Sequence, residues 1–202
     1  MKTLHAKKLD INLREYTKRT ALESDFTQLI KEDTIVCVDG QPTILYMKLD
    51  WDFKELRRVL LAVDYQTTER AGGLKTTSRV FGYQPRIALR RDFCAASTLQ
   101  AQEQKKATVI STFGTKIAEI YREYFPNVFQ AHWDWTQSKV RDEWKIKDTP
   151  FTSGIINKNN PLKYHFDAGN IKDVCSCMLG LKRSIGGGYL SVPELGIGFE
   201  IA

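Results

Sequence analysis

The sequence predicts an α+β fold in a single domain spanning residues 1–202, with a helical support region that includes a hairpin (1–149) before a β-rich region (150–202). Three observations predict this fold. The chain is long enough for one domain with a sizeable core. Apolar residues recur at helical spacing before Phe125, whereas short apolar or alternating runs, separated by turn sequences, follow Pro150.

Composition excludes several classes of protein. The mean hydropathy is −0.36, and no apolar run in the sequence approaches the roughly 20 residues that cross a bilayer, so we expect no membrane span. Residues 1–10 carry lysines without the apolar stretch of a secretory signal. We therefore expect a cytoplasmic protein whose four cysteines are reduced thiols.

The charge balance favours a polyanionic partner. Thirty lysine and arginine residues against 24 acidic residues give a net charge of +6. Basic residues gather in two clusters with aromatic residues between them: Arg79, Arg86, Arg90 and Arg91, and then Lys139, Arg141, Lys145 and Lys147. Interleaved cations and rings suit contacts to a nucleic-acid backbone and stacking on bases. The alternative is an ordinary mixed surface above buried aromatic residues.

The first third of the chain predicts two helices and a hairpin. Apolar residues at helical spacing within 22–30 indicate a docking helix. The runs 35–38 and 43–48 flank Asp39-Gly40, a sequence typical of a tight hairpin turn. Asp52 can cap a helix over residues 53–63.

The middle of the chain predicts a loop followed by helices. Residues 67–91 contain glycines and a proline but little periodicity, so we expect a long loop with short strands. Residues 95–125 have a helical pattern that Pro126 ends, and residues 128–144 suggest another helix. After Pro150, strands are predicted at 151–157, 163–167, 174–182, 189–192 and 197–201.

The motif with the clearest chemical meaning is an HxDxxN pattern that contains His165, Asp167 and Asn170. Residues two apart on a strand face the same side, so His165 and Asp167 can present an imidazole and a carboxylate to one point. These groups are two of the three ligands of a non-haem Fe(II) site of the 2-His-1-carboxylate type. The alternative is a pair that only serves a hydrogen-bonded turn.

The sequence around this motif resembles the Fe(II)/2-oxoglutarate dioxygenase superfamily. The resemblance rests on Phe151–Asn157, on the HxDxxN motif and on Gly186–Glu194, and it extends to residues 83–94. The chain is most similar to the TET and J-binding-protein branch, which oxidises the 5-methyl group of pyrimidines in nucleic acid. Bacteriophage 5-methylpyrimidine dioxygenases are small members of that branch.

The resemblance implies a double-stranded β-helix (jelly-roll) core whose first strands lie in residues 150–202. It also implies Fe(II), 2-oxoglutarate as cosubstrate and O₂. By the resemblance, His165 and Asp167 would be the catalytic metal ligands and Asn170 would contact the target base. Gly187, Gly188 and Glu194 match a structural strand beside the site.

Three arginines are further candidates for anion contacts. Arg86 is a candidate for binding the substrate, Arg183 for binding the cosubstrate and Arg90 for either anion. The alternative for each is a surface salt bridge.

One departure from the family pattern concerns the third metal ligand. In that branch it is a histidine beyond the Pro-Glu strand, followed by an arginine for 2-oxoglutarate, but the remaining histidines here are His5 and His132. We expect the jelly roll to be incomplete at the C-terminus, with its last strands supplied by a longer chain or by a second polypeptide. The third alternative is a protein that has lost catalysis. A strand at 197–201 without further partners would leave an exposed edge.

Two other spacings are expected to be structural. His132-Trp133-Asp134 repeats the HxD pattern within a predicted helix, where residues two apart diverge, so a surface or capping role is expected for His132. Cys175 and Cys177 are expected to be buried strand thiols, because zinc needs four ligands, and Cys94 is expected in the core.

The predicted function is Fe(II)/2-oxoglutarate-dependent oxidation of 5-methylcytosine or thymine in DNA, in the host cytoplasm if a phage encodes the protein. A duplex base would have to flip into the site. Two alternatives remain open. One is a non-catalytic nucleic-acid-binding module with a dioxygenase fold, and the other is a dioxygenase that acts on a small molecule or a protein.

Overall fold

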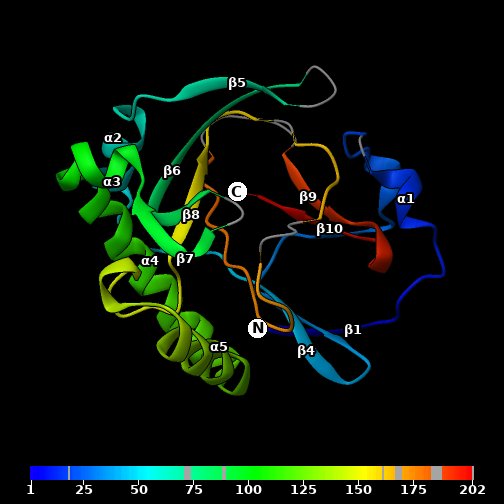
Figure 1. The fold of residues 1–202 in the computed structure, drawn as a ribbon. Coiled ribbons are helices and arrows are strands. Elements are labelled where there is room, and N and C mark those ends of the chain that lie inside the picture. The colour runs from blue at the N-terminus through cyan, green and yellow to red at the C-terminus, as the bar shows by residue number, and fades with distance from the viewer. Residues whose placement is uncertain are drawn as a thin grey trace. The chain divides into compact units, whose positions relative to one another are not determined.

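The computed structural model describes residues 1–17, 19–70, 74–87, 90–160, 162–166, 170–182 and 188–201, with the backbone alone for 68–70, 74–75, 85–87 and 90–93 (Figure 1). The fold is α+β, as predicted. The chain forms two compact units. Unit 1 comprises residues 1–51, 161–169 and 178–202, and unit 2 comprises residues 52–160 and 170–177. Among the helices described, none has the length and apolar character needed to cross a bilayer.

The first sheet of unit 1 has the strand order β1-β3-β4. Strand β1 (Lys2–Ala6) pairs in parallel with β3 (Thr34–Val38), and β3 pairs antiparallel with β4 (Gln41–Tyr46). Asp39 and Gly40 join β3 to β4 with φ angles of 51° and 77°. Positive φ at both turn positions matches the twist of a hairpin, so the predicted Asp-Gly hairpin is confirmed.

The second sheet of unit 1 has β10 (Ile197–Glu200) at its centre. This strand pairs in parallel with β2 (Gln28–Ile30) and antiparallel with β9 (Tyr189–Val192). The short 3-10 helix η3 (Pro193–Leu195) connects β9 to β10. The strands predicted at 189–192 and 197–201 are confirmed, the second ending one residue earlier.

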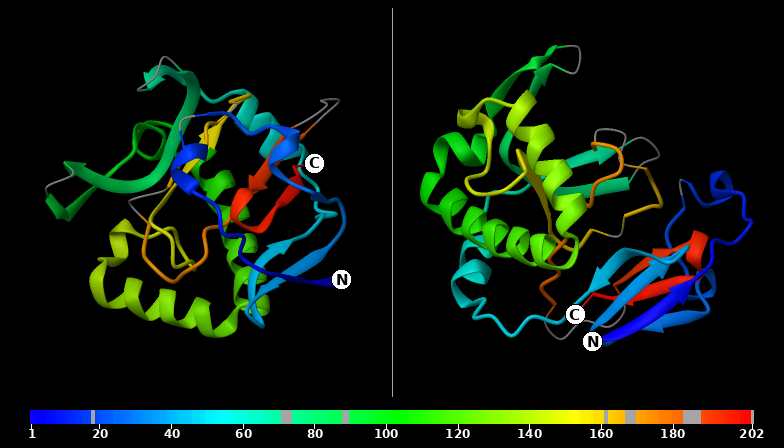
Figure 2. Two further views of the ribbon diagram at one scale, coloured as in Figure 1. Left: turned by 90° about the vertical axis from the view of Figure 1, so that its right-hand side faces the viewer. Right: turned by 90° about the horizontal axis from the view of Figure 1, so that it is seen from below.

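The two sheets of unit 1 pack against each other around one hydrophobic core (Figure 2). Ile30, Val36, Ile197 and Phe199 are buried in it, and side chains from β1, β4 and β9 pack around them. Tyr46 also ties the sheets together, because its hydroxyl donates to the carbonyl of Glu200 at 2.7 Å. Unit 1 is therefore a small two-layer sandwich of three strands on three. None of its described sheets closes into a barrel.

The docking helix predicted over residues 22–30 is wrong. That stretch contains the 3-10 helix η1 (Glu23–Asp25) and then β2, and the only α-helix described before β2 is α1 (Leu13–Tyr16). Phe26, in between, packs against Gly198 of β10, where an added Cβ would lie 2.8 Å from its ring. Pairing of β2 with β10 therefore prevails over the helical spacing of the apolar residues.

The sheet of unit 2 is built on β6 (Leu74–Ile87), a strand of 14 residues. It pairs antiparallel with β5 (Gln66–Arg70), β7 (Arg90–Ala96) and β8 (Ser153–Asn157). The long loop predicted over residues 67–91 is therefore wrong. Gly82 has a φ of 77° and approaches the Thr152 carbonyl, and Pro85 lies where the register shifts, so both mark irregularities in a strand.

The helices of unit 2 largely follow the prediction. They are α2 (Lys54–Leu61), α3 (Thr98–Gln102), α4 (Gln104–Tyr124) and α5 (Pro126–Lys139), followed by the 3-10 helix η2 (Asp142–Trp144). Residues 95 and 96 belong to β7, and Ser97 caps α3. Pro126 occupies the first turn of α5, where its missing N–H costs nothing, so it both ends one helix and starts the next.

Two predicted strands after Pro150 are absent from the described residues. Residues 174–182 form no strand, and the predicted strand 163–167 is reduced to one isolated bridge between Lys163 and Thr20, with residue 167 outside the description. The strand predicted at 151–157 is confirmed as β8.

Candidate functional site

His165 lies two residues after the Lys163 bridge and belongs to no strand or helix. Its side chain is exposed, and its Nδ1 lies 2.7 Å from the carbonyl oxygen of Lys163. A carbonyl oxygen can only accept, so Nδ1 carries the proton in this contact. The lone pair of the neutral ring is then on Nε2. A metal-binding histidine has the same arrangement, because its other ring nitrogen donates a hydrogen bond to a carbonyl or carboxylate.

The other residues of the HxDxxN motif are only partly described. Phe166 is 71% exposed, and Asp167 lies outside the described residues. Asn170 is exposed in unit 2 and donates from its amide to Ser176 Oγ at 2.9 Å. Within the part of the chain that the structure describes, no group of three or more metal-ligating side chains is present. The predicted pairing of His165 with Asp167 therefore remains a prediction.

The predicted anion contacts lie on or outside the unit 2 hairpin. Arg86 is near the end of β6, and Arg90 is the first residue of β7, paired with Ile87. The two arginines are thus brought to the same end of one hairpin. Arg183 lies outside the described residues.

The Gly-Gly strand expected beside the site coincides with β9 and η3. Gly187 is outside the description, and Gly188 has a φ of 75°, a conformation that favours glycine. Glu194 lies in η3 and forms an ion pair with Lys8, with 3.3 Å between Nζ and Oε1. The carbonyl of Glu194 also accepts from the N–H of Leu9, so this strand end is tied to the N-terminal segment.

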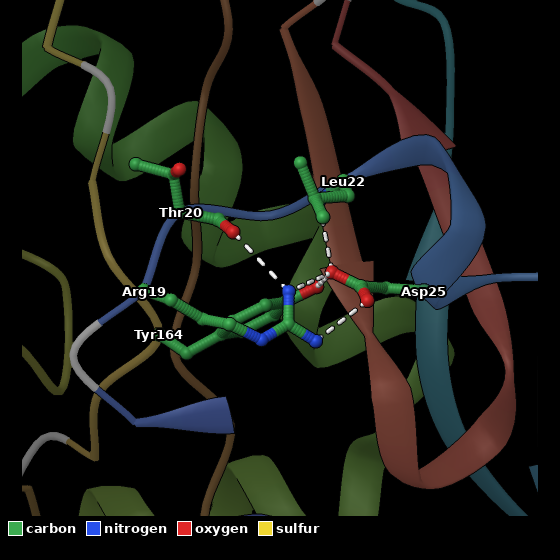
Figure 3. A network of polar contacts seen from close by, with 5 residues as sticks. All are labelled: Arg19, Thr20, Leu22, Asp25 and Tyr164. Carbon is green, nitrogen blue, oxygen red and sulfur yellow. Dashed lines mark hydrogen bonds and ion pairs between the residues drawn. The ribbon is translucent and has the colours of Figure 1, made fainter. Parts of the chain in front are cut away.

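A polar network that sequence reasoning missed is centred on Arg19 and Asp25 and includes Tyr164, the residue before His165 (Figure 3). The guanidinium donates to both carboxylate oxygens of Asp25 at 2.7 Å each, a bidentate pair. The hydroxyl of Tyr164 donates to Oδ2 of Asp25 at 3.1 Å, and the N–H of Leu22 donates to the same oxygen at 2.8 Å. The Arg19 hydrogen bond, with smaller contributions from Leu22 and Tyr164, lowers the pKa of Asp25 to about 2.

Two aromatic rings lie beside the guanidinium of this network. Arg19 lies 4.6 Å from the ring centroid of Tyr16 and 5.6 Å from that of Tyr164. The two rings meet edge to face at 5.7 Å. Cation–π contacts and the ion pair thus fix the same arginine from three directions. No spacing in the sequence links these residues, because 139 positions separate Asp25 from Tyr164.

No protein-family model, curated protein or solved structure matches this chain. The dioxygenase resemblance therefore rests on the sequence motifs themselves.

His132 is not the surface or capping residue that the sequence predicted. It is buried in α5, 6.1 Å from the ring of Tyr121 and 5.6 Å from that of Phe151. Burial lowers the pKa of His132, and its Nδ1 has no hydrogen-bond partner among the described residues. Asp134 is exposed and accepts from Gln130, so the two ends of this HxD pattern face different environments.

The cysteines are less buried than predicted. Cys175 is half-buried, and its backbone N–H donates to the Tyr121 hydroxyl at 3.2 Å, while Cys177 is exposed. Neither lies in a strand. Cys94 is half-buried in β7, and burial raises its pKa.

The net positive charge belongs entirely to unit 2. By sequence, unit 2 has 19 lysine and arginine residues against 13 acidic residues, whereas unit 1 has eleven of each. The two predicted basic clusters differ in their surroundings. Arg141 and Lys145 pair with Glu143 and Asp142, so the second cluster is partly neutralised.

The four arginines of the first basic cluster do not all lie together: one is buried, and the other three lie near the end of the β6–β7 hairpin. Arg79 is buried in β6, with 8% of its surface exposed. Arg86, Arg90 and Arg91 lie toward the end of the β6–β7 hairpin, on strands whose register places them together. These three arginines therefore place a concentration of the positive charge of unit 2 in this hairpin.

Proposed function

We propose that this protein is an Fe(II)/2-oxoglutarate-dependent dioxygenase that oxidises the 5-methyl group of a pyrimidine in DNA. The observation that carries the proposal is the state of His165. Its Nδ1–H is held by the Lys163 carbonyl, so Nε2 has the lone pair that a metal needs. The donor set of an HxD motif, one imidazole and one carboxylate, is also what non-haem Fe(II) takes.

In this proposal, Nε2 of His165 and the carboxylate of Asp167 hold the iron, with a further histidine from outside these residues. Iron would supply the oxidising chemistry together with 2-oxoglutarate and O₂: 2-oxoglutarate would lose CO₂ and become succinate with one oxygen atom of O₂, and the other oxygen atom would enter the methyl group. The contribution of this chain is to hold the ligands and position the substrate. The two-layer packing of unit 1 is compatible with part of a jelly-roll core.

The positive charge of unit 2 supports DNA as the substrate. An excess of six positive charges in one unit favours association with phosphates, through the release of counterions. Arg86 and Arg90, at the end of the hairpin, are proposed to contact this backbone or the substrate, Asn170 to bond the edge of a flipped base, and Arg183 to bind 2-oxoglutarate.

The test is incubation of the complete protein with 5-methylcytosine- or thymine-containing DNA, Fe(II) and 2-oxoglutarate, followed by mass spectrometry of the nucleosides. We expect 5-hydroxymethylpyrimidine and succinate in parallel. His165→Ala and Asp167→Ala should abolish both products. His5→Ala, which changes an exposed histidine of β1 in the same unit, should leave them unchanged. Absence of both products with the wild-type protein would refute the proposal.

The same charge distribution favours a second candidate, a nucleic-acid-binding module without catalysis. It predicts salt-dependent DNA binding that neither a chelator nor His165→Ala changes, with no succinate formed. A dioxygenase for a small molecule or a protein would instead form succinate without any nucleic acid.

A further inference from the structure

The Nδ1 atom of His165 contacts one backbone carbonyl oxygen at 2.7 Å. That carbonyl belongs to Lys163, two residues before the histidine. Residues 163 and 164 are not held in a sheet, and the antiparallel bridge between Lys163 and Thr20 is isolated. Other contacts must therefore hold this short segment in place.

Those contacts come from the Arg19 network. The N–H of Tyr164 donates to the carbonyl of Arg19 at 3.0 Å, next to the bridge. The Tyr164 ring lies against the guanidinium, and its hydroxyl donates to Asp25. Tyr164 is thus fixed at its backbone, its ring and its hydroxyl, all by residues of the segment 16–25.

We propose that Arg19, Asp25 and Tyr164 are positioning residues for His165. By fixing Tyr164, they fix the preceding carbonyl of Lys163, which selects the Nδ1–H tautomer of His165 and the direction of its Nε2. The part of the inference that concerns metal binding rests on the proposed function, in which Nε2 is a metal ligand. The part that concerns the tautomer of His165 does not depend on that function.

The alternative is that the network only stabilises the fold of unit 1, as a bidentate pair shielded by rings can do. The two possibilities differ in what happens at His165 when the network is weakened but the fold survives. A purely structural network would lower the stability of unit 1 and leave the His165 tautomer unchanged. A positioning network would change the tautomer as well.

Two variants weaken the network in different ways. Tyr164→Phe removes the hydroxyl that bonds Asp25 and keeps the ring, while Asp25→Asn removes the charge and keeps the size. The matched control is Glu32→Gln, which breaks an ion pair with Lys2 in the same unit. Far-UV circular dichroism selects the variants that remain folded.

The first readout is the tautomer of His165 in the protein without metal, from long-range ¹H–¹⁵N NMR at a pH where the ring is neutral. The chain has three histidines, so His5→Ala and His165→Ala assign the signals. We expect the Nδ1–H form in the wild type and in Glu32→Gln, and a mixture with the Nε2–H form in Tyr164→Phe and Asp25→Asn. An unchanged tautomer in folded variants would overturn the inference.

The second readout is the affinity for Fe(II), titrated without oxygen. Loss of the hydrogen-bond partner of a metal ligand weakens metal binding by about 10- to 100-fold. We expect this loss in both network variants and not in Glu32→Gln. If the wild type binds Fe(II) no better than His165→Ala, the proposed function fails, while the tautomer comparison still decides whether the network positions His165.

Discussion

Replacement of the buried His132 by phenylalanine should make unit 2 less sensitive to acid. The imidazole is enclosed by aromatic rings, with Phe151 edge-on at 5.6 Å, and Tyr121, whose pKa burial raises to about 12, remains neutral beside it. Among the described residues, nothing accepts a hydrogen bond from its Nδ1. A protonated ring would therefore leave a charge in an apolar site.

The size of the effect follows from proton linkage. Burial lowers the pKa of His132 in the folded protein below the ordinary value of 6.5. Unit 2 then has its full stability above about pH 6.5, and it loses about 1.4 kcal/mol for each pH unit as the pH falls from there toward the folded pKa, because only the unfolded chain takes up the proton. In His132→Phe this loss disappears. Removal of the unpartnered Nδ1 should also offset the cost of fitting the larger ring, which is about 1–3 kcal/mol.

The assay is urea unfolding at pH 7.5, 6.5 and 5.5, followed by tryptophan fluorescence. Trp133, Trp135 and Trp144 all lie in unit 2, so the signal reports mainly on that unit. Relative to pH 7.5, the wild type should lose more stability at pH 5.5 than His132→Phe does, by no more than about 1.4 kcal/mol. Equal losses would refute the claim that His132 is buried without its proton. His5→Phe, at an exposed position, should behave as the wild type does.

Three further predictions concern core packing, helix stability and charge. Gly198→Ala should destabilise unit 1 by about 1–3 kcal/mol in thermal unfolding, because the new Cβ would lie 2.8 Å from the ring of Phe26. Gly114→Ala, in the interior of α4 with open space around it, should instead stabilise unit 2 by about 0.5–1 kcal/mol. Replacing both Arg90 and Arg91 by glutamine should weaken DNA binding and reduce the salt slope by about 2, one for each phosphate that is no longer neutralised.

Specific results would contradict the Gly198 and the arginine predictions. A Gly198→Ala protein as stable as the wild type would mean that Phe26 does not cover β10. A salt slope left unchanged by the double arginine variant would remove the hairpin from the DNA interface. Lys145→Gln is its control, because Lys145 already pairs with Asp142 and should contribute little to phosphate binding.

Local signals predicted the parts of the fold that local interactions decide. The Asp39-Gly40 turn and helix α2 were predicted from a few adjacent residues, and both are present. The predicted cap is wrong, because the N-cap residue of α2 is Phe53, while Asp52 accepts a hydrogen bond from the N–H of Lys54 at 2.9 Å. Strand β6 was missed because Gly82 and Pro85 are typical of loops, and only its pairing with β5, β7 and β8 makes it a strand. Likewise, β2 is a strand because β10, far along the chain, pairs with it.

The candidate site divides in the same way. His165 was found because the HxD pattern is contiguous in sequence. The network residues beside His165 were not predicted, because Arg19, Asp25 and Tyr164 are linked by charge and ring contacts that leave no periodic pattern in the sequence. The burial of His132 was missed for a similar reason, since the aromatic rings around it come from α4 and from the segment before β8.

The pairing of β2 with β10 has a consequence for how the protein is made. Residues 28–30 must wait for residues 197–199 before the second sheet of unit 1 can form, whereas nearly all of unit 2 is one continuous stretch, 52–160. During synthesis from the N-terminus, unit 2 can fold while most of the second sheet is still missing. Closing the sandwich requires contacts between segments far apart in the chain, and such contacts are slow to form. Until residues 197–199 are made, the apolar side chains of β3 lack their partners from β10, so a chaperone that binds nascent apolar strands would assist the folding of unit 1.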